Sequence, residues 1–549
     1  MRGVDNFENV VESEFELKVG ISSLDGDEKD GQDHAVQNWK DEINGSYSNS
    51  TCDHISNDDN GGQEDGSQSQ DLSEKSQFKD KYAPQFFAAL AANFGSFALG
   101  SVLSWTSVAL PDLRERKSIG EISDFEETWI SSIALLGATA SCTVVGLMME
   151  KFGRRKCMLL LTTPFCLGWI LITFAQNVWM MYIGRFLTGF CGGGCSIVVP
   201  VYITETASVK IRGMLASGFD MLITVGILYI FIIGTYVNWQ YQAVACGVIP
   251  IVFHAFMMFA PESPRYLVEQ RKLSDASKAL CWLRGAKSTQ HIQREMNELV
   301  SSVDESMEKS ASWRDIIKDG SILKPTIIAL MLMVFQQLSA IDAVMFYTVD
   351  IFRAAGTDID ENLSANIVGT VQVLATITAA LFVDHSGRRC LLLISEIGMV
   401  ISLGGMGAFF YLKQQNNDEV PANLSWLPLA SLMVHTMAFS VGMGPLPWLL
   451  MAELLPNNVK GMASGLVTIT RWILGFAVTM VFKEVMKILG MHGGYWLFSA
   501  FCFLGTIFVF YFVPETKGKS LDEIQEFFKS PQQKNRGASI EGKPEALKV

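Results

Sequence analysis

The segment EKFGRR at residues 150–155 returns in altered form as DHSGRR at residues 384–389. In both copies an acidic residue is followed three positions later by the same Gly-Arg-Arg triplet. A second pattern repeats in the same order, since Pro-Glu-Ser at 261–263 returns as Pro-Glu-Thr at 514–516. Short patterns that recur in register indicate that the chain holds two copies of one structural unit.

A third repeated pattern places a base seven residues after an acid. Glu205 is followed by Arg212, and Glu453 is followed by Lys460. An ionised side chain beside hydrocarbon costs about 2.5–3.5 kcal/mol unless it is paired, so acids and bases gathered at helix ends favour pairing over simple topology anchoring. We therefore expect a charged latch that pairs in one conformation and separates in another. Its expected members are Glu150, Arg154, Arg155, Arg185, Glu205, Arg212, Glu262, Asp384, Arg388, Arg389, Glu453, Lys460 and Glu515.

The composition is that of a membrane protein. Of the 549 residues, 49% are apolar and 18% are charged, and the mean hydropathy is +0.25. Soluble domains carry about 25% charged residues. We expect an all-α membrane protein with twelve transmembrane helices in two six-helix bundles, because twelve apolar stretches can each cross about 30 Å of hydrocarbon. They lie near 84–105, 129–149, 157–176, 179–203, 214–236, 242–260, 325–352, 364–383, 390–411, 426–452, 463–486 and 494–513.

Charge and polarity divide the chain into segments. Residues 1–80 hold 20 of the 56 acidic residues but only 6 of the 43 basic ones, and we expect a disordered acidic tail there. The polar segment 261–324 carries 11 Lys and Arg residues and is expected to form a helical linker between bundles at 81–260 and 325–516. A C-terminal tail follows at 517–549. Since basic loops favour the cytosolic side, both termini and the linker are expected there, with no cleavable signal peptide.

Two glycosylation sequons lie outside the tail, Asn362-Leu-Ser364 and Asn423-Leu-Ser425. In the expected topology both fall in extracytosolic loops, so Asn362 and Asn423 are candidate glycosylation sites. The ten cysteines form no Cys-x-x-Cys pair, and no His, Ser or Cys constellation gathers in a loop. We expect neither an enzyme nor a cofactor, a metal site or a nucleic-acid partner.

Polar side chains inside the apolar stretches indicate a central binding site. Gln336 and Gln337 lie about 18 Å along the seventh stretch, near mid-bilayer. At least one is expected to face a cavity, and helix–helix hydrogen bonding is the alternative. In the tenth stretch Pro445 and Pro447 remove backbone donors beside Trp448, which frees carbonyl groups and weakens the helix. Amides and an aromatic face suit an uncharged, hydroxyl-rich ligand.

Seven short motifs lie along the apolar part of the chain: GRR (153–155), GRF (184–186), PVYITE (200–205), PESPR (261–265), QQLS (336–339), GPLPW (444–448) and PETKG (514–518). Together they resemble the signatures of the sugar-porter family in the major facilitator superfamily, and the resemblance covers residues 84–528. The runs WTSVALP at 105–111 and FYT at 346–348 are similar to its insect facilitated trehalose transporter branch. The resemblance implies a gate at Pro445–Trp448 and a set of sugar contacts. The expected sugar contacts are Gln336, Gln337, Asp342, Gln372, Trp448, Asp220 and Phe439.

Three charged residues depart from the family pattern. Asp220 and Asp342 stand where sugar porters usually have glutamine and asparagine, and Arg471 stands where asparagine is common. We expect Arg471 to compensate one of the aspartates through a hydrated cavity. Leu99 fills the position where proton-coupled members carry an aspartate.

The interpretation that these residues favour is a monomeric transporter in the lipid bilayer of the plasma membrane. It would move a neutral sugar, either a hexose or a trehalose-type disaccharide, by facilitated diffusion and alternating access. Two alternatives stay open. One is a proton-coupled symporter that uses Asp220 or Asp342, and the other is a non-transporting sugar sensor that signals through its acidic tail.

Overall fold

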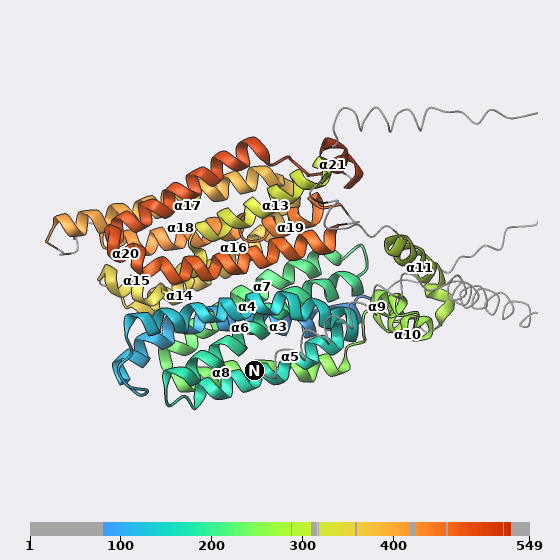
Figure 1. Ribbon diagram of the computed structural model, residues 1–549, viewed down its shortest axis with the longest axis horizontal. Coiled ribbons are helices and arrows are strands. Elements are labelled where there is room, and N and C mark those ends of the chain that lie inside the picture. The colour runs from blue at the N-terminus through green and yellow to red at the C-terminus, as the bar shows by residue number, and fades with distance from the viewer. Residues whose placement is uncertain are drawn as a thin grey trace, which may run out of the picture. The chain divides into compact units, whose positions relative to one another are not determined.

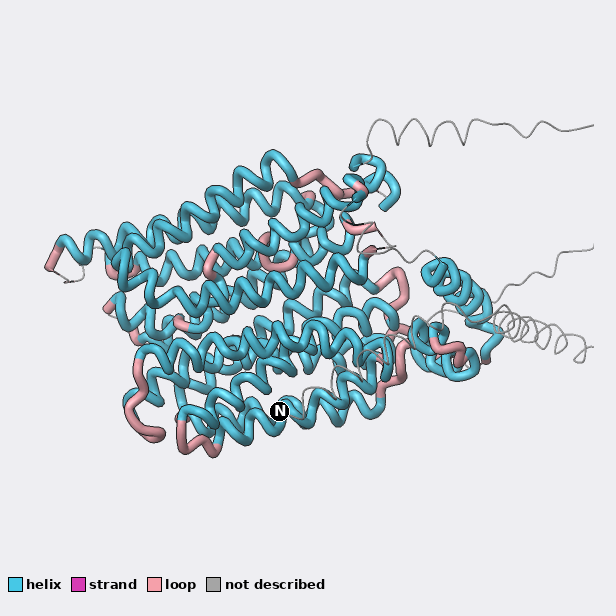
Figure 2. The backbone as a smooth tube through the Cα atoms, viewed as in Figure 1, coloured by secondary structure: helices cyan, strands magenta, loops and turns pink. Residues whose placement is uncertain are grey.

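The structure is a computed structural model that describes residues 81–528 apart from 287, 309–315, 317, 357–358, 418, 420–423, 457–458 and 520. The acidic tail expected over 1–80 lies outside the described residues. Long helices make up most of the described chain, and they run side by side along one common direction (Figures 1 and 2). Eleven helical segments of this described part are long and apolar enough to cross a membrane.

Six long helices form the N-terminal half. Glycines bring two of them close together, because a Cβ atom at Gly193 would lie 2.5 Å from the Cα atom of Ala138. The six helices are α3 (Ala83–Arg116), α4 (Asp124–Phe152), α5 (Arg154–Thr173), α6 (Val178–Thr206), α7 (Arg212–Tyr236) and α8 (Trp239–Phe259). The glycines at 189–194 thus allow α6 to pack closely against α4, as small residues do between membrane helices.

Short helices follow the first half and lie beyond one end of the long helices (Figure 1). We call this end the linker end and the other the opposite end. Arg284 ties the linker to the bundle, since its guanidinium donates to the Thr206 carbonyl at 3.0 Å and pairs with Glu295 at 2.6 Å. The linker helices are α9 (Pro264–Glu269), α10 (Leu273–Arg284), the 3₁₀ turn η1 (Thr289–Ile292) and α11 (Gln293–Glu308).

The C-terminal half repeats the arrangement with more interruptions. Gly490, with φ 73° and ψ 159°, divides α20 into the expected eleventh and twelfth spans, and this division accounts for the difference between eleven segments and twelve spans. The helices are α13 (Gly320–Leu338), α14 (Ile341–Phe346), α15 (Thr348–Ala355), α16 (Glu361–Ser386), α17 (Arg388–Gln415), α18 (Leu427–Val441), α19 (Leu446–Leu454), α20 (Lys460–Phe512) and α21 (Leu521–Phe528).

Two spans expected to be continuous are broken. The seventh is interrupted at Ala340, whose φ of 61° is left-handed, and the tenth is interrupted between Val441 and Leu446. The second break lies at the proline-containing segment where a weak helix was predicted. In contrast, α3 continues to Arg116, beyond the expected end at residue 105, because its last turns are held by polar contacts such as the 2.6 Å pair between Arg116 and Asp112.

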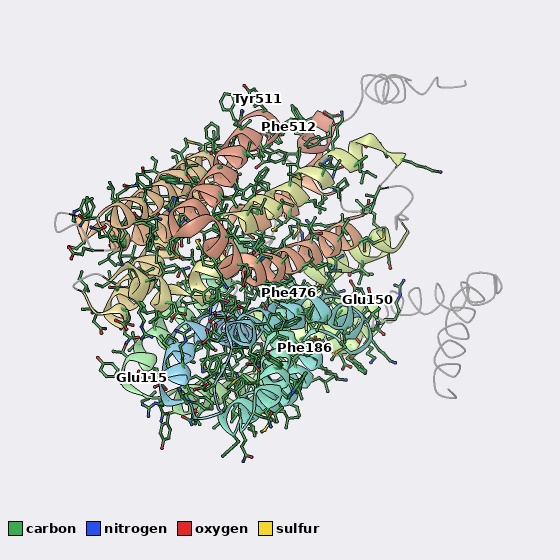
Figure 3. The ribbon with its side chains drawn as sticks, turned by 60° about the vertical axis from the view of Figure 1, so that its left-hand side comes forward. Glu115, Glu150, Phe186, Phe476, Tyr511 and Phe512 are labelled. Atoms are coloured by element: carbon green, nitrogen blue, oxygen red, sulfur yellow. The ribbon has the colours of Figure 1, made fainter. Side chains whose placement is uncertain are left out.

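Large apolar side chains cover the outer surface of the long helices. Leu381 and Ile401 are each about two-thirds exposed. Tyr511 and Phe512 point away from the C-terminal half (Figure 3). Apolar surface of this extent is unfavourable in water and suits contact with hydrocarbon. The two halves therefore form a membrane-spanning helical bundle.

Candidate functional site

A central cavity lies between the two halves, and its empty volume is about 830 Å³ with the open mouth included. The N-terminal half contributes α3, α6 and α7, and the C-terminal half contributes α13, α14, α16, α18, α19 and α20. Aromatic and polar groups both line it. The aromatic residues are Phe219, Phe346, Phe439, Trp448 and Trp472, and the polar ones are Ser196, Asp220, Thr224, Gln336, Asp342, Gln372, Thr376, Ser440 and Arg471.

The structure brings together most of the sugar contacts expected from the sequence. Gln337 is the exception, because its buried carboxamide does not line the cavity and instead lies against α20, where a Cβ at Gly475 would be 3.1 Å from its Oε1. Adjacent residues on a helix point about 100° apart, so only one of the two glutamines faces the cavity. The expected contacts that line it are Asp220, Gln336, Asp342, Gln372, Phe439 and Trp448.

Gln336 connects the cavity wall to the break in the tenth span. Its Nε2 donates to the carbonyl of Met443 at 2.5 Å and to that of Gly444 at 3.2 Å. These carbonyls lie between α18 and α19, where the helical ladder is interrupted. The Oε1 atom of the same amide is buried without a protein partner. Gln336 therefore combines the two expected roles. Its Nε2 bonds the break in the tenth span, and its Oε1 stays available to accept a hydrogen bond from a ligand or water.

Charged groups from both halves meet at the cavity. Arg471 pairs with Asp342 at 3.6 Å, so one aspartate has the expected partner, although the contact is direct rather than through cavity water. The Arg471 guanidinium also lies 4.0 Å from the ring centre of Trp472. Asp220 enters from α7, and within the described residues it has no ion pair shorter than 4.0 Å. Asp342 Oδ2 and Arg471 Nη1 are buried without protein partners. The cavity thus offers donors and acceptors to a ligand or to water.

The hydroxyl groups that line the cavity are not marked by a clear signal in the sequence. Ser196 and Thr376 each donate to a carbonyl within their own helix, at 2.6 and 2.9 Å. Serine and threonine make such bonds wherever they occur in membrane helices, so their position alone does not mark a site. Tyr347 of the FYT run lies outside the cavity and stacks on Phe482 with 5.7 Å between ring centres.

A cluster of charges holds the linker end of the N-terminal half. Arg154 pairs with Glu205 at 2.8 Å, and the Ser263 hydroxyl donates to Glu205 at 2.5 Å. Glu262 accepts the backbone N–H groups of Arg154 and Arg155, both at 2.9 Å. A carboxylate at this position satisfies free donors at the start of α5 and stabilises the helix dipole.

The C-terminal half contains an equivalent cluster. Arg388 pairs with Glu453 at 3.5 Å, and the Thr516 hydroxyl donates to Glu453 at 2.6 Å. Glu515 accepts the backbone N–H groups of Arg388 and Arg389 at 3.0 and 3.1 Å. Partial burial alone would raise the pKa of Glu515, but these and neighbouring backbone donors hold it below its ordinary value. The Gly-Arg-Arg triplet, the acid of the third pattern and the Pro-Glu-Ser or Pro-Glu-Thr segment thus meet in one place in each half.

The repeated triplet begins with glycine for a reason that the geometry explains. Gly153 and Gly387 have φ values of 90° and 82°, in the region that favours glycine. A Cβ atom at Gly153 would also lie 2.7 Å from an oxygen of Glu262, and one at Gly387 would lie 2.8 Å from an oxygen of Glu515. Each glycine lets a capping carboxylate approach the helix start.

Some expected members of the charged latch lie elsewhere, so the prediction needs correction. Arg185 lies near the opposite end of α6 and is fully buried, where it donates to the carbonyls of Val102 at 3.0 Å and Ile130 at 3.1 Å. Carbonyl oxygens of neighbouring helices replace the carboxylate that a latch requires. Arg185 is therefore a structural contact between α3, α4 and α6.

Other expected members of the latch lack acidic or basic partners. Glu150 is at the linker end (Figure 3), and both it and Arg212 are exposed without an ion pair shorter than 4.0 Å in the described chain. Lys460 donates to the Ala452 carbonyl at 2.7 Å rather than to an acid. The side chain of Asp384 lies outside those that the structure describes.

The glycosylation candidates also require a correction. Asn362 lies in the first turn of α16 rather than in a loop, and the side chain of Ser364 in the same sequon is fully buried. An amphipathic helix start explains this, because Ser364 packs inward while Glu361 stays near the surface. Asn423 lies outside the described residues.

The comparisons with known proteins agree on one family. The family described as "Sugar (and other) transporter" matches residues 79–528. The facilitated trehalose transporter Tret1 of Polypedilum vanderplanki is 41% identical over 444 residues, which cover 80% of this chain and 87% of that protein. The Culex quinquefasciatus protein of the same name is 39% identical over 445 residues, which cover 80% and 85%.

Solved structures share the fold. The xylose transporter XylE from E. coli, in a partially occluded inward open conformation, has a TM-score of 0.67 and 23% identity, and the match covers 80% of this chain and 100% of that one. The same transporter bound to 6-bromo-6-deoxy-D-glucose has a TM-score of 0.68 and 24% identity, covering 81% and 99%. With a family match over most of its length and relatives near 40% identity, this multi-pass membrane protein belongs to the sugar transporter family.

Proposed function

We propose that this protein carries a neutral sugar, either a hexose or a trehalose-type disaccharide, by facilitated diffusion through the central cavity. The observation that carries this proposal is the set of buried polar atoms without protein partners at the cavity, including Gln336 Oε1, Gln372 Oε1 and Asp342 Oδ2. Sugar hydroxyls can donate to all three, and Trp448 and Phe439 offer apolar faces to the C–H side of a sugar ring. The names of the relatives near 40% identity support trehalose.

Transport by alternating access requires the two halves to move as units. The charged clusters at the linker end support this role, because each one binds helices of a single half together. The breaks at Ala340 and at 442–445 flank the cavity and provide flexible points in its wall. Gln336 bonds directly to the second break, so a sugar that contacts its Oε1 would act on the α18–α19 gate.

The proposed location is the plasma membrane, with both termini and the linker in the cytosol. The support is the basic character of the linker segment, together with its position at one end of the helices. Both walls of the cavity come from one chain, so we propose a functional monomer.

Uptake into vesicles reconstituted with the purified full chain tests the proposed function. Labelled trehalose or a hexose should equilibrate with the lumen, and unlabelled neutral sugars should compete. Trp448→Ala should raise the half-saturating sugar concentration about tenfold, since a lost aromatic face weakens ligand contact. Trp179→Ala is the matched control, because Trp179 is exposed on α6 away from the cavity. Absence of competition by every neutral sugar would overturn the substrate class.

A proton-coupled symporter is the second candidate, and Asp220 favours it. This carboxylate lines the cavity without a short ion pair among the described residues, so it is placed to exchange a proton with cavity water. Acidification of the vesicle lumen in step with sugar entry would select this candidate. Sugar entry that leaves lumen pH unchanged would select facilitated diffusion.

A further inference from the structure

The bonds that join the two halves gather at the opposite end of the molecule. Within the described residues, the Val349 N–H donates to Ser107 at 3.2 Å, and Asn366 donates to Thr235 at 2.9 Å. The Ser132 hydroxyl of α4 lies 3.4 Å from a methionine sulfur of α20. These contacts lie near the helix ends farthest from the linker, so the halves are held together on that side.

A buried carboxylate stands at the centre of this contact. Glu127, at the start of α4, has a side chain only 3% exposed and accepts two bonds from Arg114, each 2.7 Å long. Lys483 of α20 donates to the same carboxylate at 2.8 Å. Arg114 also reaches Asp350 of α15 at 3.4 Å. We call Arg114, Glu127, Asp350 and Lys483 the Glu127 node.

The Glu127 node differs from an ordinary surface ion pair in geometry and burial. Two acids and two bases balance each other, and the Arg114–Glu127 contact is bidentate, which favours a fixed orientation. Two of its links cross between the halves, from Glu127 to Lys483 and from Arg114 to Asp350. Because Glu127 is removed from water, loss of Lys483 leaves it with fewer partners, and loss of Glu127 leaves two cations facing each other.

We propose that the Glu127 node is the gate of the opposite end, where its crossing ion pairs hold the passage to the cavity closed. The proposal rests on the proposed function in one respect, namely that the halves separate at each end in turn. When they separate at this end, water can solvate Lys483 and Asp350, which are already partly exposed, while Arg114 stays bound to Glu127. The gate residues thus set the balance between the closed and open forms of this end.

Cysteine labelling can test the gate without a sugar. Ser132 lies five residues beyond Glu127 on α4, is fully buried and faces α20, so Ser132→Cys reports opening between the halves. The full chain carrying Ser132→Cys is placed in nanodiscs, where both faces are accessible, and treated with a water-soluble maleimide. Peptide mass spectrometry then gives the labelling rate at position 132 alone.

The gate predicts a specific pattern of rates. Glu127→Gln and Lys483→Gln, each in the Ser132→Cys background, should raise labelling at position 132 about fivefold to tenfold by shifting the population toward the open form. The double variant should label no faster than the faster single variant, because both changes break the same crossing pair. Lys117→Gln is the matched control, since Lys117 forms an exposed pair with Glu121 inside one half at 2.7 Å.

Labelling of the native cysteines distinguishes unfolding of the protein from opening of the gate. Cys195 and Cys246 are fully buried within the N-terminal half, so their labelling should stay at background in every variant. Unchanged labelling at position 132 in both single variants would overturn the gate, as would an equal rise in Lys117→Gln. Since no sugar is needed, failure of sugar uptake leaves this result interpretable, and failure of the gate leaves the uptake result unaffected.

Discussion

The two ends of the molecule use ion pairs in different ways. At the linker end the Arg154–Glu205 pair and the equivalent Arg388–Glu453 pair each lie inside one half. At the opposite end the pair between Arg114 and Glu127 also has a counterpart, because Arg353 pairs with Glu361 at 2.9 Å. Among the residues that the structure describes, the link from Glu127 to Lys483 has no charged counterpart.

The missing counterpart shows how a duplicated fold becomes asymmetric. The contact of α4 with α20 corresponds to that of α16 with α7, yet the latter is joined by the neutral bond between Asn366 and Thr235. Charges that bind helices within a half are needed in both copies for stability. In the proposed gate, the charges that cross between the halves control their separation, and they are concentrated in the Glu127 node.

The largest effect is expected from substitutions that break the repeated arrangement at the linker end. Gly153→Ala and Gly387→Ala should each cost about 1–3 kcal/mol in backbone strain at positive φ. The clash of the new Cβ with a capping carboxylate should add a further ~1–3 kcal/mol or more. The expected readout is a strong loss of folded protein in detergent size-exclusion chromatography. Gly213→Ala and Gly461→Ala are the controls, since a Cβ there meets nothing within 4 Å. Equal yields for all four variants would contradict this explanation of the triplet.

The next largest effect is expected where the charged cluster around Glu205 is compared with the equivalent cluster around Glu453. Glu205→Gln should destabilise the protein more than Glu453→Gln, because the Arg154 pair is shorter, at 2.8 Å against 3.5 Å, and its side chains are each 10% exposed. Removing one partner of a buried pair costs about 3–5 kcal/mol, and a partly hydrated pair costs less. Thermal unfolding of both variants measures the difference. A larger loss in Glu453→Gln would reverse the ranking.

A smaller effect is expected inside the cavity, where charges of both halves meet. Arg471→Gln leaves Asp342 without its partner at 3.6 Å and should reduce uptake, and adding Asp342→Asn should restore part of it. Asp220→Asn combined with Arg471→Gln is the matched comparison, since that pair has no contact shorter than 4.0 Å. The pairing is wrong if the Asp342 double variant recovers no more uptake than the Asp220 double variant.

The fold was largely predictable from sequence, because apolar stretches and in-register repeats are properties of the chain itself. The cavity was partly predictable, since an amide such as Gln336 is costly in hydrocarbon and therefore marks a polar neighbour. Which of two adjacent glutamines faces inward depends on helix rotation, which the sequence leaves open. The Glu127 node was not predictable, because Lys483 lies 356 residues from Glu127 along the chain and Asp350 lies 236 residues from Arg114.

The smallest expected effect concerns the pH dependence of the linker end. Backbone N–H groups at the start of α17 hold the pKa of Glu515 below its ordinary value of 4.5. A carboxyl with a depressed folded pKa stabilises the protein above its unfolded pKa, and this stabilisation is lost as pH falls through the lower folded value. A charge at a helix start contributes about 0.3–1 kcal/mol. Glu515→Gln should therefore lower the unfolding temperature slightly at pH 7, and the difference from the unsubstituted protein should shrink as pH falls below about 4.5. Unfolding scans between neutral and acidic pH measure this, with the exposed Glu121→Gln as control, and a difference that stays constant with pH would show that the Glu515 charge does not stabilise α17.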